Sequence, residues 1–568
     1  MAHVSLPTDL EIARAARLAP IEDVAAAAGI PSDRLEPYGR HVAKVDLGAR
    51  EDLAAQPTAK YVVITAITPT PLGEGKTTTA VGLAQGLEHL GHRATLALRQ
   101  PSMGPTFGIK GGAAGAGYSQ VLPMEQLNLH LTGDFHAVTA AHNLLAAMVD
   151  NHLHHGDDLG LDPRSIAWRR VLDVNDRALR NIVIGLGGRA DGVPRQTGFD
   201  ITAASEVMAT LALAGSLADL RARLGRIVIG YTGDGTPVTA EQLAGAGSMA
   251  VLLRDAIKPN LLQTLENTPV LVHAGPFGNI ATGNSSVIAD LIGIHAGDYL
   301  VTEAGFGADM GAERFFNIKC RTSGLRPDAA VIVATVRALK AHSGKYKIVA
   351  GRPLPEDLLR ENPDDVLAGA ANLRKQIENI RLHGVSPVVA INAFPTDHPS
   401  EHQVIRDIAA DMGARAAVCT HFADGGRGAI ELAEAVSEAA EEPSDFRFLY
   451  PDTASLREKI AAVATQVYGA DGVSYSTQAA KQLDTYERAG FGRLPVCIAK
   501  THLSISSDPA LKGAPTGWTL PVREVRASVG AGFVYPICGD VRTMPGLSKN
   551  PAAARIDLDD DGQVVGLS

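Results

Sequence analysis

The stretch Tyr61-Val-Val-Ile-Thr-Ala-Ile67 runs directly into Thr68-Pro-Thr-Pro-Leu-Gly-Glu-Gly-Lys-Thr-Thr-Thr79. The first segment is apolar and β-branched, the second is rich in glycine, and a helical pattern over 76–90 follows. Strand, glycine-rich loop and helix in this order are typical of a phosphate-binding loop (P-loop), in which backbone N–H groups and a helix N-terminus face phosphate. The sequence therefore predicts a nucleotide site at the carboxyl end of this strand.

The polar residues of the loop have distinct expected roles. Lys76 is placed to reach the β- and γ-phosphates, and Thr77 to offer its hydroxyl to Mg²⁺. Thr70 stands where the common pattern has glycine, and Gly73 adds flexibility instead. A glycine-rich turn with a surface lysine is the alternative, which the flanking strand and helix disfavour. The predicted ATP-binding residues are Thr70, Pro71, Leu72, Gly73, Glu74, Gly75, Lys76 and Thr77.

Short apolar runs alternate with longer helical patterns along the chain, which predicts βαβ units and a parallel sheet buried on both faces. Besides 76–90, helices are expected over 203–224 and 428–442. We expect an α/β fold, with a P-loop NTPase-like, mostly parallel sheet flanked by helices and two smaller α/β domains. Strands are expected over 61–67, 93–99, 181–186, 226–231, 269–273, 330–336, 387–391 and 414–420.

The length of 568 residues is too great for one compact core. We predict a nucleotide-binding and catalytic domain over 1–350, a second domain over 351–450 that contributes to a further substrate site, and a C-terminal domain over 451–568. Glycine- and proline-containing stretches near 351–355 and 441–451 are the candidate linkers.

Composition excludes several classes of function. The formal net charge is −10, which argues against broad binding to nucleic acid or to a membrane surface. None of the four cysteines forms a CxxC pair, so a disulfide framework or a structural zinc site is not expected. With no signal peptide and no long apolar run, the expected location is the cytoplasm.

Arg99 ends the strand predicted over 93–99, which we expect to lie next to the P-loop strand. Ligands bind at the carboxyl ends of such strands, where an arginine can hold a carboxylate or stabilise a transferring phosphoryl group. An ordinary strand-end arginine is an equally open interpretation of the residue alone.

Two further groups of polar residues are candidates. Glu303 and Asp309 flank glycines in a loop predicted at the active face, where they would orient substrate or nucleotide. His130, Asp134 and His136 have a spacing that permits a metal site, but a structural role is favoured because no third nitrogen or sulfur ligand is placed.

Long motifs in the chain resemble those of the formate–tetrahydrofolate ligases. The P-loop is similar to that family's own variant, with threonine at its first position. The resemblance extends over nearly the full length. Further matching segments are Arg99-Gln-Pro-Ser-Met-Gly-Pro-Thr-Phe-Gly-Ile-Lys-Gly-Gly-Ala-Ala-Gly-Ala-Gly-Tyr118, Gly275-Pro-Phe-Gly-Asn-Ile280, Val333-Ala-Thr-Val-Arg-Ala-Leu-Lys340, Asn392-Ala-Phe-Pro-Thr-Asp397 and Thr543-Met-Pro-Gly-Leu547.

The resemblance implies that ATP, formate and tetrahydrofolate give ADP, phosphate and 10-formyltetrahydrofolate through formyl phosphate. It also implies Mg²⁺ with ATP, a monovalent cation (K⁺ or NH₄⁺) as activator, and a homotetramer. By the same resemblance, Lys76 and Arg99 are catalytic, Arg99 holds formate and then formyl phosphate, and Phe394 and Phe422 sandwich the pterin ring. Phe422 departs from the family, which generally has tryptophan there, and so keeps an aromatic face with less area.

Two other functions are alternatives to the ligase. A P-loop switch ATPase of the partitioning or metal-delivery type has a similar Lys-Thr-Thr loop, but usually carries a second lysine early in the loop, and this chain has none between Thr68 and Gly75. An inactive scaffold is disfavoured by the intact Gly75, Lys76, Thr77 and Arg99.

Overall fold

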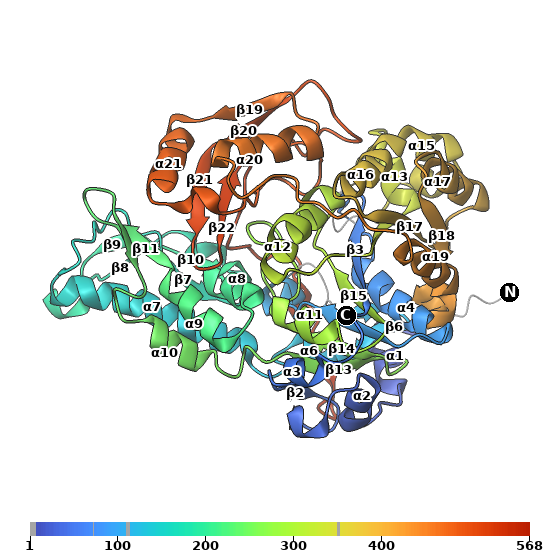
Figure 1. Ribbon diagram of the computed structural model, residues 1–568, viewed down its shortest axis with the longest axis horizontal. Helices are drawn as coiled ribbons and strands as arrows, with labels where there is room; N and C mark the ends of the chain where they lie inside the picture. Colours follow the sequence, from blue (N-terminus) through green and yellow to red (C-terminus); the bar gives the residue numbers. More distant parts are fainter. Residues whose placement is uncertain (1–6, 72, 109–113, 349–352, 568) are drawn as a thin grey trace.

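The computed structural model describes residues 7–71, 73–108, 114–348 and 353–567. Its centre is a twelve-stranded sheet with helices on both faces (Figure 1). This confirms the predicted α/β class and the large, mostly parallel sheet. Along the main path the strands are β1 (Leu35–Pro37), β2 (Ala43–Val45), β13 (Asn260–Thr264), β14 (Pro269–Val272), β4 (Ala94–Leu98), β15 (Tyr299–Glu303), β3 (Lys60–Ala66), β16 (Ala329–Ala334), β17 (Ser386–Asn392) and β18 (Arg415–Cys419).

From β14 to β18 every neighbouring pair on this path is parallel, so the carboxyl ends of β4, β15, β3, β16, β17 and β18 lie along one edge. The other pairings are antiparallel, including those of β6 (Ser119–Leu122) with β13 and with β5 (Gly115–Ala116). A parallel edge of this kind is where α/β proteins bind ligands.

The two faces of the sheet bury separate apolar cores, because side chains alternate along each strand. On β3, Tyr61 and Val63 belong to one core, and Val62 and Ile64 to the other. The first core is covered by α11 (Val287–Gly293), α13 (Val336–His342), α16 (Ala370–Leu382) and α17 (Pro399–Asp411), and the second by α4 (Lys76–His89) and α19 (Ile430–Ala440).

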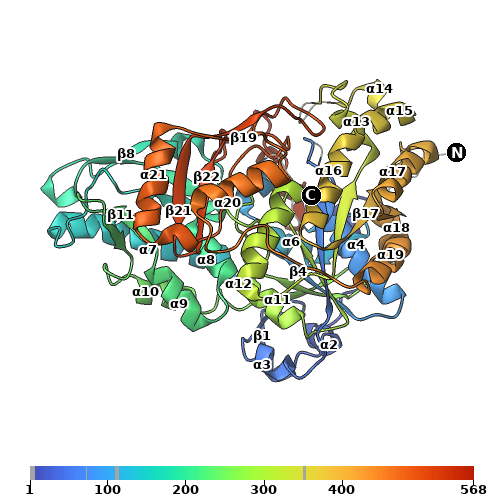
Figure 2. The same cartoon turned by 45° about the horizontal axis from the view of Figure 1, so that its top comes forward.

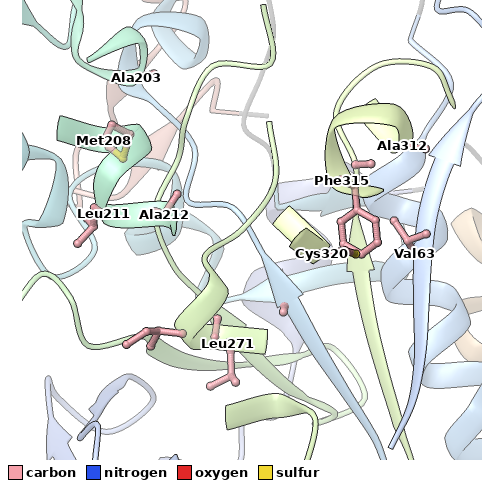
Figure 3. Close-up of a cluster of buried hydrophobic side chains, with 14 of the residues drawn as sticks. Val63, Ala203, Met208, Leu211, Ala212, Leu271, Ala312, Phe315 and Cys320 are labelled. Atoms are coloured by element: carbon pink, nitrogen blue, oxygen red, sulfur yellow. The ribbon is translucent and has the colours of Figure 1, made fainter. Parts of the chain in front are cut away.

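Two π-helical segments follow β15, over Ala308–Ala312 and Phe315–Cys320. Phe315 and Cys320 pack against Val63 of the P-loop strand (Figure 3). The same apolar core reaches Leu271 of β14 and Met208 of α8 (Glu206–Leu213). One face of the P-loop strand β3 is therefore covered by tightly packed, fully buried side chains.

The strand over 93–99 does not lie next to the P-loop strand as predicted. β15 lies between β4 and β3 and pairs in parallel with both. The correction matters for the site because it places Glu303, the last residue of β15, between Arg99 and the P-loop.

Several other predictions were wrong in detail. The expected helix over 203–224 is two helices, α8 and α9 (Leu217–Gly225), each started by a serine cap. The strands expected over 181–186 and 226–231 are outside the central sheet, in the antiparallel pairs β8 (Ile182–Ile184) with β9 (Arg195–Thr197) and β11 (Val228–Tyr231) with β12 (Pro237–Thr239).

These pairs lie in an extended part of the molecule with α7 (Asp134–His155) and α10 (Ala246–Leu252), at the left of Figure 1. A third apolar core joins α20 (Leu456–Ala462), α21 (Thr477–Arg488), β21 (Glu524–Ser528) and β22 (Phe533–Ile537), drawn in orange and red in Figure 2.

The predicted division at 350/351 falls at residues outside the described ranges. The sheet continues past it into β17 and β18, and the domain limits 1–350, 351–450 and 451–568 stay a prediction. Within the described ranges, no helix is long and apolar enough to cross a membrane.

Candidate active site

The conformation of the P-loop is stabilised by hydrogen bonds to a glutamate within the loop, Glu74. Glu74 is buried, and its Oε1 accepts hydrogen bonds from the backbone N–H (2.9 Å) and the hydroxyl (3.0 Å) of Thr70. Its Oε2 accepts from the hydroxyl of Thr335 at 2.9 Å. Thr70, the departure from the common pattern, therefore supplies the hydroxyl that ties the loop to its glutamate. Leu72 lies outside the described residues.

Gly75 is required for both its conformation and its surroundings. It has φ +78°, in the left-handed region, and a Cβ there would lie 2.5 Å from Nδ2 of Asn392. That amide donates to the carbonyl oxygen of Glu74 at 3.1 Å. α4 begins at Lys76, so Lys76 and Thr77 form its first turn, at the helix end that favours a bound anion.

Glu303 lies directly beside the P-loop helix. The Thr77 hydroxyl donates to Oε2 of Glu303 at 2.8 Å. A threonine hydroxyl and a carboxylate next to a phosphate site are the hard oxygen donors that Mg²⁺ takes alongside nucleotide phosphates. The described residues therefore fit the Mg²⁺ predicted at Thr77, and they add Glu303 as its neighbour.

Arg99 follows β4, on the far side of Glu303 from the P-loop. Its Nη1 donates to the carbonyl oxygen of Pro276 at 3.2 Å, and its guanidinium lies against Gly305, where a Cβ would be 3.7 Å from Nη2. Its Nε is buried and has no hydrogen-bond partner among the described residues. The guanidinium thus keeps donor capacity at the edge where the predicted phosphoryl transfer would occur.

Asp309 is placed beneath the loop and is 2% exposed. Its Oδ2 accepts from Nζ of Lys500 and its Oδ1 from Nε2 of Gln376, both at 2.8 Å. Gln376 also donates to the hydroxyl of Thr68, at the start of the P-loop, at 3.0 Å. Burial lowers the pKa of Lys500, and the nearby Asp309 opposes that shift. Both carboxylate oxygens of Asp309 thus have protein partners, and its predicted contact with substrate stays a prediction.

Phe394 and Phe422 follow the neighbouring strands β17 and β18. The guanidinium carbon of Arg337 lies 3.5 Å from the ring centroid of Phe394, a cation–π contact. Phe422 is 42% exposed, which is unusual for a phenylalanine and leaves a ring face open. The two residues lie at the same edge of the sheet as the P-loop, and their clamping of a shared ligand stays a prediction.

The metal alternative at His130, Asp134 and His136 gains no support. Asp134 begins α7, and its buried carboxylate accepts from Nζ of Lys44 and Nδ2 of Asn260, both at 2.8 Å. No cluster of potential metal-binding side chains occurs in the parts of the chain that the structure describes.

The chain is similar to known proteins over nearly its whole length. The family model described as formate–tetrahydrofolate ligase matches residues 7–568. A formate–tetrahydrofolate ligase of Saccharopolyspora erythraea is 73% identical, with 100% of each chain covered. Formate–tetrahydrofolate ligase 3 of Rubrobacter xylanophilus is 72% identical, and the ligase of Cutibacterium acnes 69%, each over 99% of this chain and 100% of the relative. This chain therefore belongs to the formate–tetrahydrofolate ligase family.

Proposed function

We propose that this chain ligates formate to tetrahydrofolate at the expense of ATP, using the edge of the sheet formed by the ends of β4, β15, β3, β17 and β18. The observation that carries the proposal is the order along this edge: Arg99, Glu303 and the P-loop follow neighbouring strands. Arg99 and the P-loop are thus separated by one strand along this edge, and the proposed binding of formate by Arg99 would place formate beside the nucleotide. The comparisons give no support to the switch-ATPase alternative.

In the first step, an oxygen of formate attacks the γ-phosphorus of ATP. The new P–O bond gives formyl phosphate, and the bond to the β-phosphate oxygen breaks to release ADP. Lys76 and the N–H groups of the first turn of α4 neutralise the phosphates, while Arg99 holds the formate carboxylate in line. Thr70, Pro71, Gly73, Glu74 and Gly75 form the described part of the predicted ATP-binding loop.

Mg²⁺, held at Thr77 beside Glu303, would shield the charge of the β- and γ-phosphates. In this arrangement Glu303 would lie beside Mg²⁺ and would not contact the substrate. Asp309 would hold the start of the P-loop in place through its hydrogen bond with Gln376. The monovalent cation K⁺ or NH₄⁺ remains an expected activator, with no residue assigned to it.

In the second step, N10 of tetrahydrofolate attacks the formyl carbon. The C–N bond forms and the C–O bond to phosphate breaks. Phosphate leaves with that electron pair and, overall, takes up the proton that N10 loses, which gives 10-formyltetrahydrofolate. Phe394 and Phe422 supply the flat apolar faces that a pterin ring stacks on. Exclusion of water protects formyl phosphate from hydrolysis between the two steps.

The homotetramer and a cytoplasmic location complete the proposal. Five aliphatic side chains of the extended part are exposed, which favours contact with a second copy: Leu172, Val174, Val183, Leu186 and Val193. Light scattering of the purified chain would give the mass of the oligomer, and V183E/L186E should reduce this mass.

The proposed cytoplasmic location is supported by the cysteines. All four are buried free thiols, which suits a reducing compartment.

Transfer of oxygen tests the acyl phosphate route. Formate labelled with ¹⁸O should deliver one labelled oxygen to each inorganic phosphate formed, because the attacking oxygen stays on phosphorus. Unlabelled phosphate accompanying 10-formyltetrahydrofolate would rule out formyl phosphate as the intermediate.

A further inference from the structure

The segment 421–429, which carries Phe422, lies along one face of α4. Figure 2 shows α18 (His421–Asp424) beside α4, and the 3₁₀ turn Gly425–Ala429 continues the segment. The α4 residues that meet it have helical spacing: Thr79, Gly82, Gly86 and His89. The helix that starts at the P-loop is therefore also the support of the residue proposed to stack on folate.

Two glycines make this close approach possible. A Cβ on Gly82 would lie 2.6 Å from Cβ of His421, and a Cβ on Gly86 would lie 2.9 Å from the carbonyl oxygen of Ala429. Atoms do not approach this closely without displacement, so any side chain at Gly82 must move His421. His421 is the residue directly before Phe422.

A buried polar route connects the P-loop to the same histidine. The Thr79 hydroxyl donates to the carbonyl oxygen of Gly75 at 2.9 Å and lies 3.3 Å from Nε2 of His421. Burial lowers the pKa of His421 to about 4, so the ring is neutral at physiological pH. Because the hydroxyl proton is engaged by Gly75, the Nε2–H of His421 donates to the Thr79 oxygen.

The backbone around Phe422 is fixed on its other side by the β5–β6 hairpin. The Tyr118 N–H donates to the carbonyl oxygen of Phe422 at 2.8 Å, and the Ser119 hydroxyl donates to that of His421 at 2.9 Å. Gly117 has φ +57°, and a Cβ there would lie 2.1 Å from the Phe422 oxygen. The segment 421–429 thus packs between α4 and this hairpin. A shift of α4 would therefore displace Phe422.

We propose that Thr79, Gly82 and His421 are positioning residues that couple the P-loop to Phe422, so that nucleotide binding orients the folate-facing ring. The inference rests on the proposed function of Phe422. Nucleotide binding involves the first turn of α4 and its N-cap residue, Gly75. The Gly75 carbonyl oxygen accepts a hydrogen bond from the Thr79 hydroxyl, which in turn contacts His421. Coupling of this kind is reciprocal, so folate must tighten nucleotide binding by the same factor.

A tryptophan at position 422 reports on the coupling directly. In F422W, a non-hydrolysable ATP analogue with Mg²⁺ should change the emission of Trp at that position in the absence of folate. The unsubstituted chain, which contains only Trp168 and Trp518, gives the background. T79V in the F422W chain should lose the change, and T79S, which keeps the hydroxyl, should retain it.

Equilibrium binding supplies the second readout. T79V should raise the Kd for tetrahydrofolate measured with the saturating ATP analogue roughly 3- to 10-fold, the range expected for one lost hydrogen bond, and leave the Kd measured without nucleotide within about twofold of the parent. By reciprocity, the Kd for the analogue should rise by the same factor when folate is saturating, and not when folate is absent. G82A should act in the same direction, and thermal unfolding checks that each variant is folded.

Two outcomes would contradict the coupling between the P-loop and Phe422. A parental Kd for tetrahydrofolate with an intact emission change in T79V would overturn the coupling. An equal rise in this Kd with and without nucleotide would also overturn it, because folate binding would then not depend on the nucleotide. If the parent chain itself forms no 10-formyltetrahydrofolate, the proposed function fails, a result distinct from either of these.

Discussion

Two parts of the same sheet edge are built in different ways. The nucleotide part, at the ends of β4, β15 and β3, contains two carboxylates, Glu74 and Asp309, that are each 2% exposed and have protein partners at both oxygens. The aromatic part, at the ends of β17 and β18, presents Phe422 with 42% of its surface exposed. Phosphate binding depends on fixed donors, whereas a flat ring needs an open apolar face. Changes in the first part should therefore affect chemistry or folding, and changes in the second part affinity.

The largest expected effect is at the nucleotide part. Lys76→Ala removes the cation placed at the β- and γ-phosphates, and the rate of ATP-dependent product formation should fall by about 10³-fold or more. The melting temperature should stay close to that of the parent, because α4 is held by apolar packing. Lys481→Ala, at an exposed position of α21, is the matched control. Parental turnover in Lys76→Ala would refute the role of the loop.

Breaking the support beneath the loop should affect stability instead. Lys500→Met leaves the buried Asp309 without its cation, which should cost about 3–5 kcal/mol in the free energy of unfolding. The exposed pair Arg360–Asp357 offers the control, since Arg360→Met should cost under about 1 kcal/mol. Urea denaturation compares the two. Equal small losses would mean that the buried pair is not needed to hold the P-loop.

A change in the aromatic part should be smaller and confined to folate. Phe422→Trp enlarges the ring face, so the KM for tetrahydrofolate should fall by roughly two- to fivefold. The KM values for ATP and formate should not change. Initial rates at varied folate measure both, and a folate KM identical to that of the parent would remove Phe422 from the clamp.

A carboxylate outside both parts gives an effect of a different kind, a dependence of the protein's stability on pH. Burial raises the pKa of Glu206 from 4.5 to about 8, although the N–H groups of Gly530 and Ala531 oppose the shift. The folded state thus holds a proton that the unfolded state has lost, and this contribution to stability declines as pH rises from about 4.5 through 8. Glu206→Gln should weaken this decline. Melting curves between pH 5 and 8.5 that are parallel for both chains would contradict the shift.

Local pattern was enough to predict the P-loop strand and helix, because strand, glycine-rich loop and helix are contiguous in sequence. The role of Glu74 could not be predicted, since its partner Thr335 is distant in the chain. The contact between Thr77 and Glu303 was also missed. It depends on β15, a short segment with polar residues at its end that was not recognised as a strand.

The extended part shows the opposite failure. The apolar run 181–186 has the composition of a buried strand, but Val183 is 53% exposed and Leu186 70%. Composition alone does not distinguish a strand covered by its own chain from one that is exposed in the single chain. Family motifs predict roles for Arg99, Phe394 and Phe422. The contact of Glu303 with Thr77 and the contacts of His421 with α4 are evident only in the folded structure.

The central claim is that this edge of the sheet phosphorylates formate and transfers the formyl group to tetrahydrofolate. Release of ADP from the purified chain, with ATP and Mg²⁺ and with formate and tetrahydrofolate added singly and together, tests it most directly. The account predicts sustained turnover only with both substrates, and one 10-formyltetrahydrofolate for each ADP. ADP release at the same rate with and without the two substrates would contradict it.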